Sequence, residues 1–318
     1  MNTQRVVNVG VKLFRIIVIN TNQQTVDADI QVESWWKIPH KERIEGRILN
    51  RVTDKNYKKL DKNVLSHQVW NPKIGLSNLT KKLDEQLYYK VVCIDKEYYI
   101  NETKHIIGRF EQNFQLHSFP FDYQKLTFHI ESKRNEKQIN LLINEYNISN
   151  LNKNHRVEEW YMPNSLSKKI NLLGNFPSVE VSMKIYRSSR YFMINIIAIN
   201  FLIHLVTLSN ITIEHTKPED RLNISVMLLL IGVAFKMNNN DSLPNISYLT
   251  HMDKYHIASL VYHSLSVLQN VISNEINNVG HFDFWSILFL GAYIFIINSV
   301  FMIKGLVSRH YRKKEIGY

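Results

Sequence analysis

The stretch "LHSFPFDYQKLTF", residues Leu116 to Phe128, interrupts two segments that alternate like β-strands. Proline has no backbone N–H to give to a neighbouring strand, so Pro120 marks a break in strand pairing. Phe119 and Phe121 on either side of it would expose a large apolar area unless the loop packs against another part of the chain. By itself the stretch is typical of a buried turn at a strand end, and the rest of the chain has to indicate what the loop contacts.

The chain on both sides of this stretch, roughly residues 5–187, consists of short strand-like segments separated by polar turns. "VVNVGVKLFRIIVIN" is rich in β-branched residues, and "VDADIQVESWW" alternates, with Val26, Ala28, Ile30 and Val32 on one face. Segments of this kind recur as far as "SVEVSMKIYR". This pattern predicts an all-β, immunoglobulin-like sandwich of about ten strands within residues 1–189.

The remaining residues, 190–318, contain four apolar segments, which predict helices at about 191–213, 219–240, 246–273 and 282–307. The first and the last are long enough to span a bilayer. The middle two are weaker, and on their own they could form a buried helical hairpin in a soluble domain. Together the four segments predict a four-helix transmembrane bundle after the sandwich.

Composition argues against several other classes of function. The formal net charge is +11, but basic residues are interspersed with acids, as on a solvated surface. The sequence has no zinc spacing, phosphate loop or RNA-binding signature, so we predict no nucleic-acid partner. Cys93 is the single cysteine, which excludes an intrachain disulfide. No nucleophile–base or metal constellation indicates an enzyme, and we predict no cofactor and no metal.

Three features in order along the chain resemble the pentameric ligand-gated ion channels, the Cys-loop receptor superfamily. They are "FPFD-x-Q" at 119–124, Arg187 five residues before Phe192, and "SLPNISYLTHMDKY" at 242–255, which is similar to the linker between the second and third membrane helices of that family. The short connection between the last two helices is similar to the compact, prokaryotic-type members. The resemblance implies a multi-pass protein of the cell membrane that forms a homopentamer or heteropentamer in the lipid bilayer.

The resemblance also implies sides of the membrane and a role for the opening stretch. The N-terminal domain and the C-terminus are expected to be extracellular or periplasmic, although the first residues lack a signal-peptide pattern. The loop is expected to couple ligand binding to pore opening through Phe119, Pro120, Phe121, Asp122, Arg187 and Pro244. Asp122 is expected to pair with Arg187, and a surface turn aspartate is the alternative. Gln112 and Leu126 occupy the positions of the family's disulfide and Ile199 that of its first-helix proline, so packing should stiffen the loop.

The second apolar segment is short for a membrane helix, and this is expected if one of its sides lines water. Spacings of 4, 3, 4, 3 and 4 place one set of residues, the pore face, on one side of a helix: Asn223, Met227, Leu230, Ala234, Met237 and Asp241. The resemblance makes Leu230 an apolar gate. An acidic ring of Glu219 and Asp220, just before Arg221, would favour monovalent cations over anions. The alternative is that the set is one side of a buried helix.

The agonist site that the resemblance implies lies between subunits, in a cage of aromatic side chains. The positions that map to it are mostly not aromatic: Gln31, Ser77, Lys133, Tyr161 and Phe176. This argues against a simple amine as the small-molecule agonist, whereas Lys133 suits an anionic ligand, and the 13 histidines leave protons open. Two hypotheses remain: a ligand-gated cation channel, and a non-conducting, membrane-anchored sandwich that binds a ligand or a partner.

Overall fold

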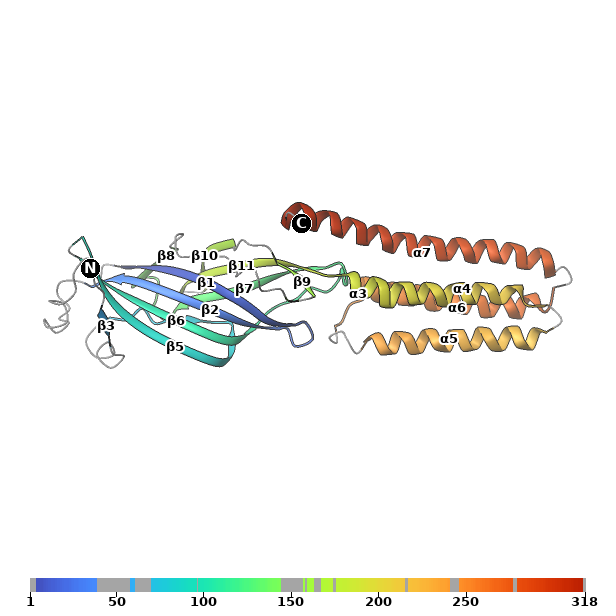
Figure 1. The fold of residues 1–318 in the computed structure, drawn as a ribbon, viewed down its shortest axis with the longest axis horizontal. Coiled ribbons are helices and arrows are strands. Elements are labelled where there is room, and N and C mark those ends of the chain that lie inside the picture. The colour runs from blue at the N-terminus through green and yellow to red at the C-terminus, as the bar shows by residue number, and fades with distance from the viewer. Residues whose placement is uncertain are drawn as a thin grey trace. The chain divides into compact units, whose positions relative to one another are not determined.

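The structure is a computed structural model that describes residues 4–38, 58–60, 70–95, 97–143, 157, 159–162, 167–173, 176–214, 217–240, 246–276 and 279–316. Its strands precede its helices along the chain (Figure 1). Backbone contacts divide the chain into a strand unit, Met1–Phe114 with Lys125–Ile185, and a helical unit, Gln115–Gln124 with Tyr186–Tyr318. The segment 115–124, which we call the FPFD loop, therefore belongs to the helical unit although strands flank it in sequence.

The strand unit is built from two sheets. The six-stranded sheet has the order β3-β5-β6-β2-β1-β8, and β8 is the strand that pairs in parallel. Its strands are β1 (Arg5–Asn20), β2 (Thr25–Lys37), β3 (Lys58–Leu60), β5 (Leu79–Ile94), β6 (Glu97–Glu111) and β8 (Ile139–Ile143). The five-stranded sheet has the order β10-β11-β7-β4, with β9 paired to β11. Its strands are β4 (Ile74–Leu76), β7 (Tyr123–Ser132), β9 (Trp160–Tyr161), β10 (Ser167–Leu173) and β11 (Phe176–Arg187).

Alternating apolar residues place the core of the strand unit between the two sheets. Val7, Val9 and Val11 of β1 are buried, as the period of two requires for one face of a strand. Phe110 of β6 and Phe128 of β7 come from different sheets, and their rings meet edge to face with centroids 5.0 Å apart. Because burying each such side chain stabilises the fold by about 1.5–3 kcal/mol, these contacts hold the sheets face to face.

Within its described residues, the helical unit contains four long helical stretches. α3 (Arg190–Phe192), a π-helical segment (Met193–Ala198), α4 (Ile199–Ser209) and a 3₁₀ turn (Asn210–Thr212) follow one another without a break. α5 (Pro218–Asn240), α6 (His251–Ser273) and α7 (Val279–Ile316) complete the unit. α6 begins at His251 and not at 246 because Thr250 caps it: its side chain accepts from the Asp253 N–H, and the Asp253 side chain accepts from the Thr250 N–H.

The prediction of a four-helix transmembrane bundle is wrong. Among the described residues, two helical stretches are long and apolar enough to cross a membrane: Arg190–Thr212, with mean hydropathy 2.0, and Val279–Lys314, with mean hydropathy 2.2. α5 and α6 are not among them; acids stand in the first turn of α5, and the buried side of α6 includes serine, histidine, asparagine and glutamine. The periodicity of these two segments indicates helices with one apolar and one polar face. It does not indicate that either face contacts lipid.

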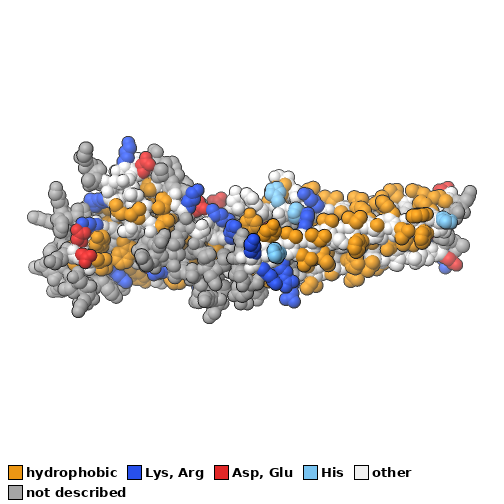
Figure 2. Space-filling view, turned by 90° about the horizontal axis from the view of Figure 1, so that it is seen from above, with side chains coloured by type: hydrophobic (Ala, Val, Ile, Leu, Met, Phe, Trp, Pro, Cys, Tyr) orange, Lys and Arg blue, Asp and Glu red, His pale blue; other side chains and the backbone are white. Residues whose placement is uncertain are grey.

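The surface of the helical unit is rich in hydrophobic side chains, as the presence of two apolar helices leads one to expect. Figure 2 shows hydrophobic side chains over much of its visible face. Leu202 of α4 and Trp285, Phe289 and Phe295 of α7 are among the exposed large hydrophobic residues. Apolar surface of this extent is typical of a protein that associates with a membrane or with a partner.

Candidate functional site

The FPFD loop is held by a buried ion pair between Asp122 and Arg187. Arg187 Nε donates to Asp122 Oδ1 at 2.8 Å and Nη2 donates to Oδ2 at 3.4 Å. The side chains are 5% and 2% exposed for Arg187 and Asp122, which excludes a surface turn aspartate. Gln124 Nε2 also donates to Asp122 Oδ2, at 2.6 Å. Since removal of one partner from a buried pair costs about 3–5 kcal/mol, the pair fixes the loop against the end of β11.

The two phenylalanines of the loop contact helices, which covers the apolar area that they would otherwise expose. Phe119 is buried, and its ring lies edge to face with that of Phe192 at 4.7 Å between centroids. The ring of Phe121 lies 5.0 Å from that of Phe301 in α7. A Cβ on Gly305 would come within 3.1 Å of the Phe121 ring, so the absence of a side chain there lets the loop approach α7 closely.

The N-terminal turn of α6 donates its unpaired N–H groups to the same loop. His251 N donates to His117 O at 3.1 Å, and Met252 N donates to Phe119 O at 3.2 Å. The first N–H groups of a helix have no partner within the helix, so these bonds satisfy them. Tyr248, just before α6, stacks on His117 with ring centroids 3.6 Å apart. Pro244, which we predicted to take part in coupling, lies outside the described residues.

Two glutamines clamp the chain where it enters and leaves the loop. Gln112 Nε2 donates to Thr127 O at 2.8 Å, and Gln112 Oε1 accepts from Thr127 N at 2.9 Å. Gln124 makes the same two bonds with the main chain of Gln115, at 2.8 and 3.0 Å. We expected packing alone to stiffen the loop, but hydrogen-bonded amide clamps contribute as well. Sequence reasoning missed this role, although Gln112 was singled out by its position.

Helix α5 leaves most of the pore face uncovered within one chain. Met227, Leu230 and Met237 are 61%, 62% and 66% exposed, and Asn223 and Ala234 are exposed too. The predicted Asp241 lies outside the described residues. A different stripe of the helix is buried in the helical unit, formed by Arg221, Ser225, Leu228 and Gly232. Among the described residues, α5 thus has a packed side, formed by these four residues, and a side that is exposed.

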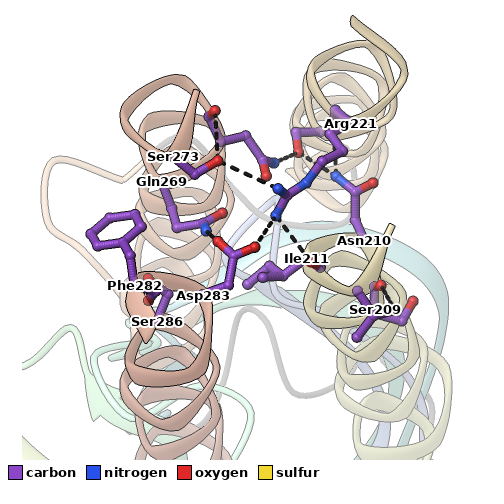
Figure 3. A network of polar contacts seen from close by, with 12 residues as sticks. Ser209, Asn210, Ile211, Arg221, Gln269, Ser273, Phe282, Asp283 and Ser286 are labelled. Atoms are coloured by element: carbon purple, nitrogen blue, oxygen red, sulfur yellow. Dashed lines mark hydrogen bonds and ion pairs between the residues drawn. The ribbon is translucent and has the colours of Figure 1, made fainter. Parts of the chain in front are cut away.

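The charged residues in the first turn of α5 are divided between its exposed and its buried side. Glu219 and Asp220 are exposed. Acidic side chains in the first turn of a helix also stabilise it by interacting favourably with the helix dipole. Arg221 is buried and lies in a polar network with Asp283 of α7 and Gln269 of α6 (Figure 3). Asp283 and Gln269 were not among the predicted site residues, because no motif connects segments so far apart in sequence.

The predicted agonist residues are divided between the two sheets. Gln31 lies on β2, where its Nε2 donates to Glu33 Oε1 at 2.6 Å. The other four lie in or next to strands of the five-stranded sheet: Ser77, Lys133, Tyr161 and Phe176. Tyr161 and Phe176 are exposed. The structure therefore places Gln31 on a different sheet from the rest of the set, and their common role stays a prediction.

Comparison with models of known protein families finds no match, and comparison with characterised proteins finds none either.

Proposed function

We propose that the chain is a subunit of a ligand-gated, cation-selective ion channel of the pentameric type. In this proposal the apolar helices α4 and α7 contact lipid, and the α5 helices of neighbouring subunits surround a water-filled path for monovalent cations. A small molecule bound between strand units of neighbouring subunits opens the path. The residues proposed to line it are those of the pore face, with Glu219 and Asp220 at one end.

The observation that carries the proposal is the uncovered side of α5. Met227, Leu230 and Met237 expose apolar side chains on a helix that belongs to the same unit as two membrane-type helices. A helix too polar for lipid is stable beside such helices when it faces protein and water. The side of α5 that is free in one chain suits this, because copies of the helix can place it around a shared axis.

The FPFD loop supports the gating part of the proposal. The loop follows three residues after β6 and runs into β7, and its side chains pack on Phe192 and Phe301. A displacement of the strands on ligand binding would therefore pull on elements next to α6 and α7. The Asp122–Arg187 pair makes this connection stiff, because both charges are buried and hydrogen-bonded.

The number of apolar helices supports the proposed sides of the membrane. Among the described residues, the candidate membrane-spanning stretches Arg190–Thr212 and Val279–Lys314 are even in number, which in this proposal puts the strand unit and the C-terminus on the same side. We propose that this side is extracellular or periplasmic.

One observation favours a second candidate function. Gln31, Ser77 and Lys133 occupy positions where an aromatic agonist cage is expected, so the gating ligand has no established chemistry. A non-conducting, membrane-anchored sandwich that binds a ligand or partner would need no helix with an exposed side beside its anchors. The exposed side of α5 therefore makes it the weaker proposal.

The test uses cells that express Leu230→Ser, with the amount of protein at the surface measured and external sodium replaced by a large organic cation. The substitution wets the proposed gate, so a standing current is expected without agonist. Its reversal potential should follow sodium. Ile231→Ser is the matched control, since Ile231 is exposed on the same helix but off the pore face. No current from Leu230→Ser protein at the surface would contradict the proposal, and a reversal potential that follows chloride would contradict cation selectivity.

A further inference from the structure

The guanidinium of Arg221 points into the helical unit and not along the exposed side of α5. Arg221 is 2% exposed. Its Nη2 donates to Asp283 Oδ2 at 3.1 Å and to Ile211 O at 3.0 Å, and its Nη1 donates to Ser273 Oγ at 3.4 Å (Figure 3). Three hydrogen bonds from a planar fork fix the direction of the group as well as its distance. The charge of Arg221 is therefore held inside by residues of three other segments.

Asp283 is itself held in place for this contact. Gln269 Nε2 donates to Asp283 Oδ1 at 2.7 Å, which leaves Oδ2 for Arg221. The main chain of the same turn of α5 is fixed too, because Asn210 Nδ2 donates to Arg221 O at 2.8 Å. Both side chains of the ion pair are nearly inaccessible, at 3% exposure for Arg221 and 7% for Asp283. Such a pair retains its charges only because each neutralises the other.

This arrangement changes the charge that the end of α5 presents to solvent. Read from sequence, Glu219, Asp220 and Arg221 give a net charge of about minus one. In the structure the two acids are exposed, whereas the positive charge is buried and neutralised by Asp283. The exposed end of α5 therefore presents two acids, beside the exposed Lys217, whose charges Arg221 does not offset.

Resting on the channel function proposed above, we propose that Asp283 is a specificity-determining residue that acts through Arg221. As the buried counter-ion, it withdraws Arg221 from the ion path and leaves Glu219 and Asp220 to attract cations. Asp283 touches no ion itself, so it is a positioning residue. Without its charge, Arg221 would have the exposed Glu219 and Asp220 as the nearest acids of its own turn, and it would cancel part of their field.

The test measures the permeability ratio of sodium to chloride from reversal potentials in a salt gradient, in the conducting Leu230→Ser background. Asp283→Asn keeps the size of the side chain and removes its charge, and it is expected to lower the ratio on the order of three- to tenfold. The double variant Arg221→Gln with Asp283→Asn removes both charges, so no charge at position 221 offsets the two acids and the ratio should return to that of the background. Glu275→Gln removes an exposed acid just after α6 and should leave the ratio unchanged.

A purely structural ion pair gives a different result. It would reduce the amount of protein at the surface or its stability, while the channels that remain would keep the background ratio, and that result overturns the proposal. If Asp283→Asn does not reach the surface, Gln269→Leu replaces it. This variant removes only the bond that orients Asp283, so a ratio that falls supports the proposal and an unchanged ratio overturns it.

If the Leu230→Ser background carries no current, the channel function fails and this inference fails with it. A conducting background with an unchanged ratio contradicts this inference alone.

Discussion

Arg187 and Asp122 stand 65 positions apart in the chain, and their side chains meet in a two-point, buried ion pair with Nε and Oδ1 at 2.8 Å. The same guanidinium lies 5.0 Å from the ring centroid of Phe119. One arginine thus joins the carboxylate and an aromatic ring of the FPFD loop to the end of β11, where the helical stretch begins.

Loss of the Asp122 charge should destabilise the protein strongly. Asp122→Asn leaves the buried guanidinium of Arg187 without its counter-ion, and we expect the free energy of unfolding to fall by about 3–5 kcal/mol. Thermal unfolding of the purified protein measures it. Glu111→Gln, an exposed acid shortly before the loop, should change the midpoint little. Equal shifts for the two variants would show that the pair does not hold the loop.

The glutamine clamps should contribute measurably to stability. Gln112→Ala and Gln124→Ala each remove two hydrogen bonds to buried or half-buried main chain, and each should lower the free energy of unfolding by about 1–3 kcal/mol. The matched control is Gln115→Ala, since Gln115 contributes its main chain to the clamp. A loss as large in Gln115→Ala would refute the role of the clamps.

Close approach of the FPFD loop to α7 should make Gly305 intolerant of a side chain. A Cβ there would lie 3.1 and 3.5 Å from atoms of the Phe121 ring, whereas at Gly291 of the same helix the nearest atom is 4.0 Å away. Val has the same helix propensity at both sites, so the difference between Gly305→Val and Gly291→Val isolates crowding. We expect Gly305→Val to be less stable by about 1–3 kcal/mol in thermal unfolding. Indistinguishable midpoints would argue against the packing described.

One surface ion pair should give the strand unit a pH dependence. The hydrogen bond from Lys125 holds the pKa of Glu180 below its usual value of 4.5, against a smaller opposing effect of burial. Because the folded-state pKa is lowered, the pair stabilises the fold above pH 4.5, and this contribution disappears as the pH falls through the folded-state pKa. The difference in unfolding midpoint between the natural chain and Glu180→Gln should therefore shrink on going from pH 7 to pH 3. A difference that stays constant over that range would exclude the linkage.

The features predicted correctly from sequence are those carried by short local patterns. The alternation of Val26, Ala28 and Ile30 predicted a strand with a buried face, and Pro120 between two phenylalanines predicted a loop that needs a packing partner. The spacing along α5 also places Met227 and Leu230 on one side of the helix, and both are exposed in the structure, but the role of that side stays a prediction.

The features that were missed depend on residues far apart in sequence or on the depth of burial. Arg221 and Asp283 are separated by 62 positions, and neither lies in a motif that indicates the other. Apolar periodicity suggested four membrane spans, but it does not show whether the second face of a helix meets lipid, water or protein. The buried His263 and Ser266 of α6 show how a helix can hide polar side chains inside the unit, which local hydropathy does not reveal.

The central claim is that α5 lines the path of the ions, and block of the Leu230→Ser current by a charged, membrane-impermeant thiol reagent tests it most directly. Single cysteines are placed along α5 in a Cys93→Ser background, one variant at a time. The account predicts rapid block at Asn223, Met227, Ala234 and Met237, and none at Leu228 or Gly232, which face the interior of the helical unit. Block that does not follow this spacing, or that is as rapid at the buried positions, would contradict the claim.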